Sequence, residues 1–187
     1  HTAIFANKLY WLWGDTNRPR YPLGNFDVTM ATSSAPKKGG PSPDAGVNYT
    51  YFTGQDGFAR KMAPIEGKGP TWLGAMLTLK DKKGTEHLVA TYVKVRKPME
   101  VYEAGLCEFN PKKKVFEKRH TFAKPKDLRP MGHPLRHRVK GRNWVYCGST
   151  LPNTRFPESY ECWLDPSTYQ KVEPDVEFTD PEGKELK

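Results

Sequence analysis

The chain has 187 residues, a length that suits one domain with a substantial hydrophobic core. Only 36% of the residues are hydrophobic, and 17 prolines and 16 glycines interrupt the sequence, so short strands and turns are favoured over long helices. No apolar run approaches the roughly 18 residues of a membrane-spanning helix, so we expect no membrane span. The chain begins at His1 without a methionine or a visible signal peptide, which indicates a processed chain or a fragment.

The net charge of +9 is of the kind found in nucleic-acid-binding proteins, but its distribution argues against that function. The positive residues are scattered among expected turns, at residues 36–38, 80–83, 112–114 and 136–142. Lysines in turns commonly keep the edges of sheets soluble. We therefore expect no nucleic-acid partner, and a polyanionic substrate or cell-surface partner is the alternative that the charge favours.

Alternation of apolar and polar residues dominates the chain and predicts strands. The turn Asn7-Lys8 closes a tight hairpin in the first group of strands, no segment has a convincing helical period, and residues 174–187 form a tail. The strands are expected, in chain order, at residues 2–6, 9–14, 26–33 and 47–53, then at 72–80, 87–95, 104–109 and 115–119, and finally at 133–139, 143–148 and 160–164.

An aromatic-rich run, a charged loop with proline and a second alternating run recur three times. The second and third copies align without a gap at an offset of 144 − 89 = 55 residues, which relates Val89 to Trp144 and Glu103 to Glu158. A repeat of about 50 residues with several short strands is typical of propeller blades. Three blades do not close a ring, so the remaining blades are expected from the parent chain or from another subunit. We predict an all-β fold, about three blades of a five-bladed β-propeller, with blades at residues 1–56, 70–122 and 131–173 and a tail at 174–187.

The first strand of each predicted blade lies innermost, so antiparallel order brings the starts of the three inner strands to one end of the molecule. That end collects His1, Trp72 and His133. It also carries three long connections, expected at residues 15–25, 94–103 and 150–158. Because binding residues concentrate on loops held by a rigid scaffold, we expect the functional site at this end.

Carboxylates, arginines and aromatic rings are concentrated on these connections. Glycoside hydrolysis needs such a set, because one carboxyl protonates the leaving oxygen and a second attacks the sugar or activates water. Asp15, Glu103 and Glu158 are the candidate catalytic residues; in the alternative interpretation Asp15 caps a turn and the glutamates are structural. The candidate substrate-binding residues are His1, Arg18, Arg20, Asp27, Trp72, Arg96, His133, Arg155 and Tyr160.

His1 and His133 have no evident third ligand, so polar contacts at the axis are favoured over a metal site. No cofactor motif is found, and a structural cation at the axis is left open. Cys107, Cys147 and Cys162 are expected to pack as buried thiols, and a disulfide between the last two is left open.

Trp11 and Trp13 flank Leu12 in the first aromatic run. In a strand, the two tryptophans then point to one side of the sheet and the leucine to the other. Packing between blades is the main interpretation of these tryptophans, and a sugar-binding surface is the alternative.

The aromatic strand that ends in Gly14-Asp15-Thr16, followed by the run at residues 27–33, resembles the first blade of five-bladed propellers of the glycoside-hydrolase type. These include arabinanases, xylosidases and fructosidases. Residues 86–92 with 102–106 resemble their second blade, and residues 132–134 with 160–161 their third. The resemblance implies catalytic acids at the starts of the inner strands. Those positions carry two histidines and a tryptophan here, so the three candidate carboxylates would substitute for them by position alone.

Two functions are therefore predicted. The first is a bacterial glycoside hydrolase, secreted or periplasmic, which acts on a glycan or polysaccharide at the long-loop end. The second is a non-catalytic propeller that serves as a binding platform for a glycan or a protein. The concentration of carboxylates with arginines favours the first, and the missing inner-strand carboxylates favour the second.

Overall fold

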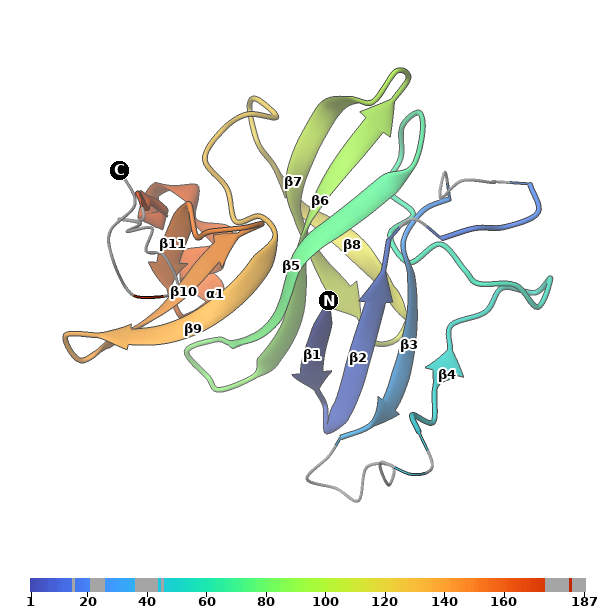
Figure 1. The fold of residues 1–187 in the computed structure, drawn as a ribbon, viewed down its shortest axis with the longest axis horizontal. Coiled ribbons are helices and arrows are strands. Elements are labelled where there is room, and N and C mark those ends of the chain that lie inside the picture. The colour runs from blue at the N-terminus through green and yellow to red at the C-terminus, as the bar shows by residue number, and fades with distance from the viewer. Residues whose placement is uncertain (15, 21–25, 36–43, 45, 174–181, 183–187) are drawn as a thin grey trace.

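The computed structural model describes residues 1–14, 16–20, 26–35, 44, 46–173 and 182. Within these residues the chain forms three four-stranded antiparallel sheets and little helix (Figure 1). The predicted all-β class is therefore confirmed. In each sheet the strands lie side by side in their order along the chain, so every sheet is built from consecutive antiparallel strands.

Sheet 1 consists of β1 (Thr2–Phe5), β2 (Lys8–Trp13), β3 (Thr29–Ser34) and β4 (Thr50–Tyr51). The hairpin between β1 and β2 turns at Ala6 and Asn7, whose φ angles of 47° and 61° are both positive. Two-residue hairpin loops favour such angles because they match the twist of the flanking strands. The predicted hairpin is confirmed, and its turn lies one residue earlier than expected.

Sheet 2 consists of β5 (Thr71–Lys80), β6 (Glu86–Arg96), β7 (Glu100–Asn110) and β8 (Val115–Thr121). The connection between β6 and β7 is a turn over residues 97–99, so the long loop predicted at residues 94–103 is wrong. Arg96 and Glu100 face each other in register, and two hydrogen bonds of 2.8 Å join their side chains. This pairing extends the hairpin to its tip.

Sheet 3 consists of β9 (His133–Val139), β10 (Arg142–Gly148), β11 (Thr154–Pro157) and β12 (Gln170–Lys171). The strand predicted at residues 160–164 is wrong, because this segment is helix α1 (Tyr160–Leu164), which a short 3-10 helix (Pro166–Thr168) follows. The hydroxyl of Ser159 accepts a hydrogen bond from the amide of Cys162 and so caps the first turn of α1. The third strand is β11, which lies in a stretch predicted as loop.

The 55-residue offset therefore relates corresponding elements only in the first half of each unit. Val89 in β6 and Trp144 in β10 lie on equivalent strands, but Cys107 lies in β7 and Cys162 in α1. Cys147 on β10 is also a free thiol, so the disulfide left open by the sequence does not form. The sequences of a strand and of a short capped helix can be aligned with each other, because both elements place apolar residues at short intervals.

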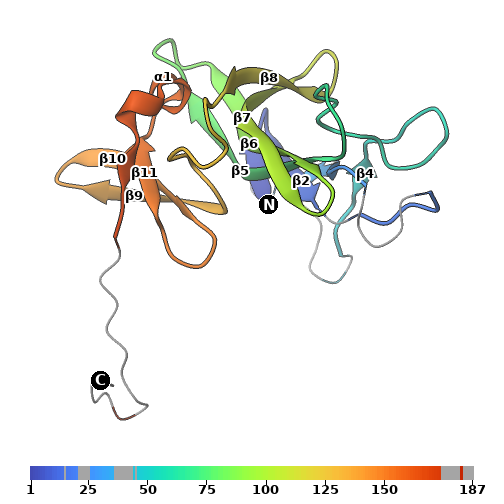
Figure 2. The same ribbon diagram turned by 90° about the horizontal axis from the view of Figure 1, so that it is seen from above.

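Sheet 2 lies between the other two sheets (Figure 2). Its first strand β5 contacts both β1 and β9. Because side chains alternate along β6, Leu88, Ala90 and Tyr92 join a core shared with sheet 1, whereas Val89 joins a core shared with sheet 3. The first core also contains Tyr10, Leu12, Met30, Phe109 and Phe116, and the second contains Leu77, Leu106, Val145, Phe156 and Trp163.

We call β1, β5 and β9, the first strands of the three sheets, the inner strands, and they run in the same general direction (Figure 1). The Thr78 hydroxyl donates to the Ile4 carbonyl at 2.7 Å, and the Ala75 amide donates to the Gly132 carbonyl at 2.9 Å, which aligns β1 and β9 with β5. We call the end at which β1, β5 and β9 begin the loop end, and the opposite end the turn end.

A buried polar network fixes the start of β5 at the loop end. Lys94 is 2% exposed, and its ammonium donates to the carbonyls of Ile65 and Gly69 and to the Thr71 hydroxyl at 3.0–3.1 Å. Burial lowers the pKa of Lys94. Asp27, 4% exposed, accepts a hydrogen bond of 2.7 Å from the Thr71 amide and forms an ion pair of 2.9 Å with Lys61. The network ties the segment before β3 and the segment before β5 to sheet 2.

The substitution Asp27→Ala should lower the free energy of unfolding by about 2 kcal/mol or more, because it leaves the buried Thr71 amide without its acceptor. Urea unfolding followed by circular dichroism measures this change. The matched control is Glu173→Ala, which removes an ion pair with Lys171 whose two side chains are 78% and 71% exposed, and should leave stability unchanged. An equal effect of the two substitutions would contradict a structural role for Asp27.

Candidate functional site

The loop end brings two of the predicted residues together. The imidazole rings of His1 and His133 lie with their centroids 4.6 Å apart, at the starts of the first and third inner strands. Trp72, near the start of β5, is partly buried against the first core. Its indole nitrogen is buried and has no hydrogen-bond partner among the described residues. His1 and His133 therefore meet at this end, whereas Trp72 packs against the first core.

Of the three candidate catalytic carboxylates, Asp15 lies outside the described residues, and Glu103 lies on β7 near the loop end. Glu103 accepts hydrogen bonds from the Tyr92 hydroxyl at 2.6 Å and from the Lys118 ammonium at 2.8 Å. Burial alone would raise the pKa of Glu103, but these two hydrogen bonds outweigh it and hold the pKa below its ordinary value. A carboxyl group that stays ionised does not serve as the proton donor of glycoside hydrolysis.

Glu158 lies at the turn end. It follows β11, which is antiparallel to β10 and therefore ends beside the first residues of β10. The Glu158 amide donates to the Asn143 carbonyl at 3.1 Å, and its side chain pairs with Arg136 on β9 at 2.5 Å. The expectation that Glu103 and Glu158 occupy equivalent places is therefore wrong. They lie on different sheets and at opposite ends of the inner strands.

Glu158 lines a cavity of about 420 Å³ at the turn end, to which all three sheets contribute. The cavity contains a second carboxylate, Glu86, which accepts a hydrogen bond of 3.3 Å from the Ala6 amide. Arg136 joins the two sides of the cavity, because it pairs with Glu158 and also donates to the Thr78 carbonyl. The other lining residues are Ile4, Lys80 and Asn143.

Two predicted arginines share a cavity of about 390 Å³ that lies between the connection from β2 to β3 and the connection from β4 to β5. The guanidinium of Arg18 lies 4.8 Å from the ring centre of Phe26 and 5.2 Å from that of Phe58, and it pairs with Asp56. The hydrogen bond from Arg18 holds the pKa of Asp56 below its ordinary value. Arg20 is exposed, and so is half of the Phe58 ring, so both are accessible from the cavity.

The remaining predicted binding residues do not line this cavity. Arg96 pairs with Glu100 at the tip of the β6–β7 hairpin. Arg155 lies on β11, where its guanidinium stacks on the Trp144 ring at 4.4 Å. Tyr160 begins α1, and Asp27 belongs to the buried network at the loop end. Of the predicted set, Arg18 and Arg20 form one group and His1 and His133 another.

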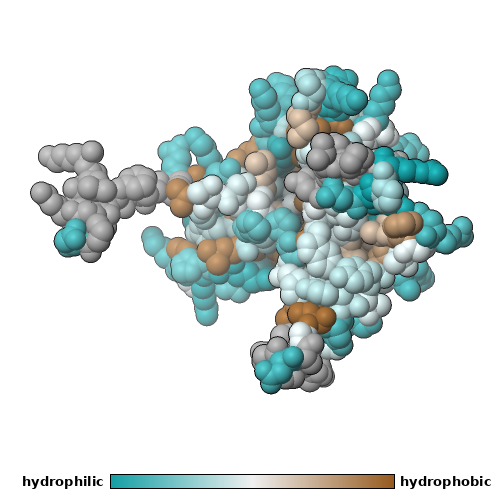
Figure 3. Space-filling model, turned by 45° about the vertical axis from the view of Figure 1, so that its right-hand side comes forward, coloured by the Kyte–Doolittle hydropathy of each residue, from teal (hydrophilic) through white to brown (hydrophobic). Residues whose placement is uncertain are grey.

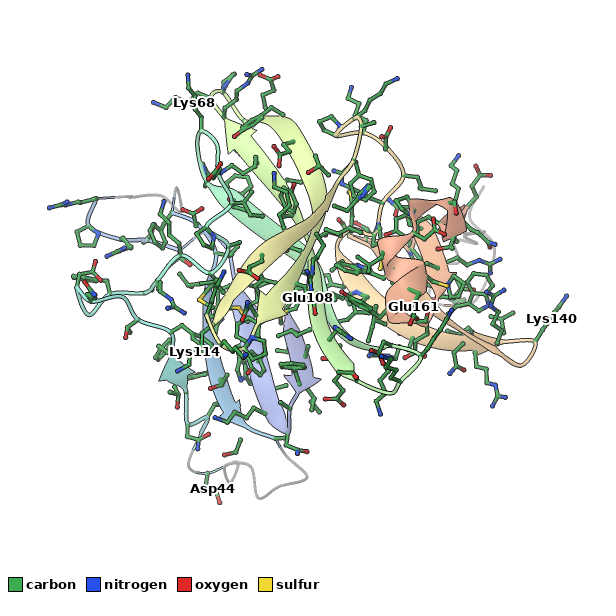
Figure 4. The ribbon with its side chains drawn as sticks, turned by 180° about the vertical axis from the view of Figure 1, so that it is seen from behind. Asp44, Lys68, Glu108, Lys114, Lys140 and Glu161 are labelled. Carbon is green, nitrogen blue, oxygen red and sulfur yellow. The ribbon has the colours of Figure 1, made fainter. Side chains whose placement is uncertain are left out.

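A further polar cluster, absent from the sequence predictions, joins sheet 2 to α1. The His87 ring lies between two carboxylates, with Nδ1 2.7 Å from Glu108 and Nε2 3.4 Å from Asp81. The Tyr160 ring stacks on His87 at 3.8 Å, and its hydroxyl donates to Glu108 at 2.7 Å (Figure 4 labels Glu108 and the helix residue Glu161). Members of the cluster lie up to 79 residues apart, from 81 to 160, so no local motif marks it.

The cluster sets the acid sensitivity of this interface. Burial alone would raise the pKa of Glu108, but hydrogen bonds from His87, Tyr160 and Arg119 outweigh it and hold the pKa below the ordinary 4.5. A depressed carboxyl pKa contributes stability above that ordinary value and loses it as the pH falls through the folded-state pKa.

The substitution Glu108→Gln should therefore reduce the difference in unfolding free energy between about pH 7 and about pH 3. Urea unfolding across this range measures the difference. The substitution Glu173→Gln, in an exposed ion pair, should leave the pH profile unchanged. A Glu108→Gln profile as steep as that of the unmodified protein would contradict the assignment.

Among the described residues, no group of three or more His, Cys, Asp or Glu side chains is arranged to hold a metal ion. In the same part of the chain, no helix has the length and apolar character needed to cross a bilayer. No family model, curated protein or solved structure matches this chain. The function is therefore argued from the geometry of the residues themselves.

Proposed function

We propose that the three sheets are consecutive blades of a β-propeller, with β1, β5 and β9 as the inner strands around its axis. Three observations support this arrangement. Each sheet runs from an inner to an outer strand in chain order, the three inner strands are neighbours, and sheet 2 is buried on both faces by the other two. The remaining blades come from the parent chain or another subunit.

We further propose that this domain binds an acidic glycan without cleaving it. The observation that carries the proposal is the cavity in which Arg18 and Arg20 meet the exposed ring of Phe58. A guanidinium binds a carboxylate or sulfate through paired hydrogen bonds, and an aromatic ring packs against the apolar face of a sugar. Asp56 and the Phe26 ring hold Arg18 in position, so little conformational freedom is lost on binding.

Binding is favoured over hydrolysis because the two predicted catalytic carboxylates that the structure describes, Glu103 and Glu158, do not form the required pair. Hydrolysis needs two carboxyl groups about 5–9.5 Å apart on either side of the scissile bond. Glu103 at the loop end and Glu158 at the turn end do not meet this requirement. The net charge of +9 also favours a polyanionic ligand. We expect such a protein to be secreted or periplasmic in a bacterium.

The substitution Arg20→Gln should weaken binding of an oligogalacturonate about tenfold, because one charge-assisted contact is lost. Isothermal titration calorimetry at low and high salt measures the affinity, with an uncharged galactan of equal length as the comparison ligand. The control Arg138→Gln removes an exposed arginine on β9 and should leave binding unchanged. Equal affinity for the charged and uncharged ligands would contradict the proposed site.

One observation favours hydrolysis as a second candidate function, namely that Glu86 and Glu158 line the same cavity. In this function Glu86 and Glu158 are the two carboxyl groups of the reaction, and Arg136 holds Glu158 in place through an ion pair. Glu158→Gln and Glu86→Gln should then each lower the rate of glycan cleavage about 100-fold or more. Release of reducing sugar measures this rate. Absence of cleavage by the unmodified protein on a panel of glycans would eliminate this candidate.

A further inference from the structure

The outer face of sheet 1, directed away from sheet 2, is covered by four aromatic rings. Trp11 and Trp13 of β2 point outward, because Tyr10 and Leu12, which alternate with them along the strand, point into the first core. The two indole rings are nearly parallel, with an angle of 8° and centroids 6.4 Å apart. Tyr49 meets both edge-on, at 5.3 and 5.4 Å, and Tyr51 is 58% exposed.

Among the residues that the structure describes, no charged residue is in register with the two tryptophans. Across the sheet, Thr2, Ala31 and Tyr51 align with Trp11 on neighbouring strands, and Thr29 aligns with Trp13. Figure 3, which brings this side of the molecule forward, shows a pale area of intermediate hydropathy here. An uncharged aromatic surface that spans several strands favours contact with another protein surface.

The outer face of sheet 3 has a complementary character. Trp144 on β10 lies between two guanidinium groups, with Arg142 at 4.8 Å and Arg155 at 4.4 Å from its ring centre. Leu135, in register with Tyr146, is 60% exposed on the same face. No acidic residue is in register on this face in the part of the chain that the structure describes. The face is therefore cationic and partly apolar.

These two faces determine which pairing between copies is favourable. Contact between two sheet 3 faces would bring arginines against arginines, and contact between two sheet 1 faces would leave both cationic faces uncovered. Contact between sheet 1 and sheet 3 places guanidinium groups over indole and phenol rings, which is favourable. Two copies related by a two-fold axis can form this contact twice. The three sheets of one copy and the three sheets of the other then close into one ring.

We propose that two copies of this chain associate through the outer face of sheet 1 of one copy and the outer face of sheet 3 of the other. The inference rests on the propeller arrangement proposed above and names a second copy as the source of the remaining blades. A ring of six sheets lies within the range of about four to eight blades known for propellers. Each copy then covers the outer face of sheet 1 and the outer face of sheet 3 of the other.

Sedimentation equilibrium of the full chain over a range of concentrations tests the proposal. The expected result is a reversible species of twice the chain mass of 21.3 kDa. Trp13→Arg places a cation opposite the arginines of the second copy and should raise the dissociation constant at least about tenfold. Trp13→Glu, an equally large loss of aromatic surface, should weaken association less, because its charge is opposite. Arg142→Glu should partly restore association when combined with Trp13→Arg.

Two further measurements distinguish a loss of association from misfolding of the variant and from failure of the glycan site. Far-ultraviolet circular dichroism shows whether each variant is folded, and calorimetry with oligogalacturonate reports on the Arg20 cavity, which these substitutions do not touch. A monomer at all concentrations, a mass that grows without limit, or equal effects of Trp13→Arg and Trp13→Glu would each overturn the proposal. Loss of glycan binding with an intact dimer would overturn the proposed function alone.

Discussion

Burial of both faces of sheet 2 is the constraint on which the rest of the structure depends. Apolar side chains that alternate along β6 enter two separate cores, one with sheet 1 and one with sheet 3. Each large apolar side chain that is fully buried contributes about 1.5–3 kcal/mol relative to exposure. A two-sided central sheet needs a partner on each face, so the three sheets stack and their inner strands become neighbours. Residues from all three sheets then meet in the cavity at the turn end, and His1 meets His133 at the loop end.

This stacking also explains the distribution of polar groups. Lys94 and Asp27 are buried, and each is satisfied by backbone groups or by an opposite charge, as burial of charge requires. Their hydrogen bonds connect loops to the start of β5, so Lys94 and Asp27 stabilise the structure of the loop end. The cluster around Glu108 has the same role between sheet 2 and α1. By contrast, Arg18 and Arg20 lie on a loop at the periphery, where an exposed cavity leaves them accessible to a ligand.

The separation of Glu103 from Glu158 is the structural reason for proposing binding in preference to hydrolysis. A strand in place of the expected loop carries Glu158 to the turn end, and two hydrogen bonds engage Glu103 at the loop end. The chain therefore offers two separate polar cavities instead of one acid–base site. One is cationic and aromatic, as binding of an acidic sugar requires, and the other contains two carboxylates beside an arginine.

The sequence by itself determined the all-β class, the hairpin of β1 and β2, the positions of the first strands of the three sheets, and the placement of His1 and His133 at the same end. These features follow from local alternation and from short connections, which neighbouring residues control. The tertiary structure alone decided that residues 160–164 form a helix, that Glu103 and Glu158 lie apart, and that His87 meets Glu108 and Tyr160. Period-2 apolar spacing does not distinguish a short capped helix from a strand, and contacts between distant segments depend on how the sheets pack.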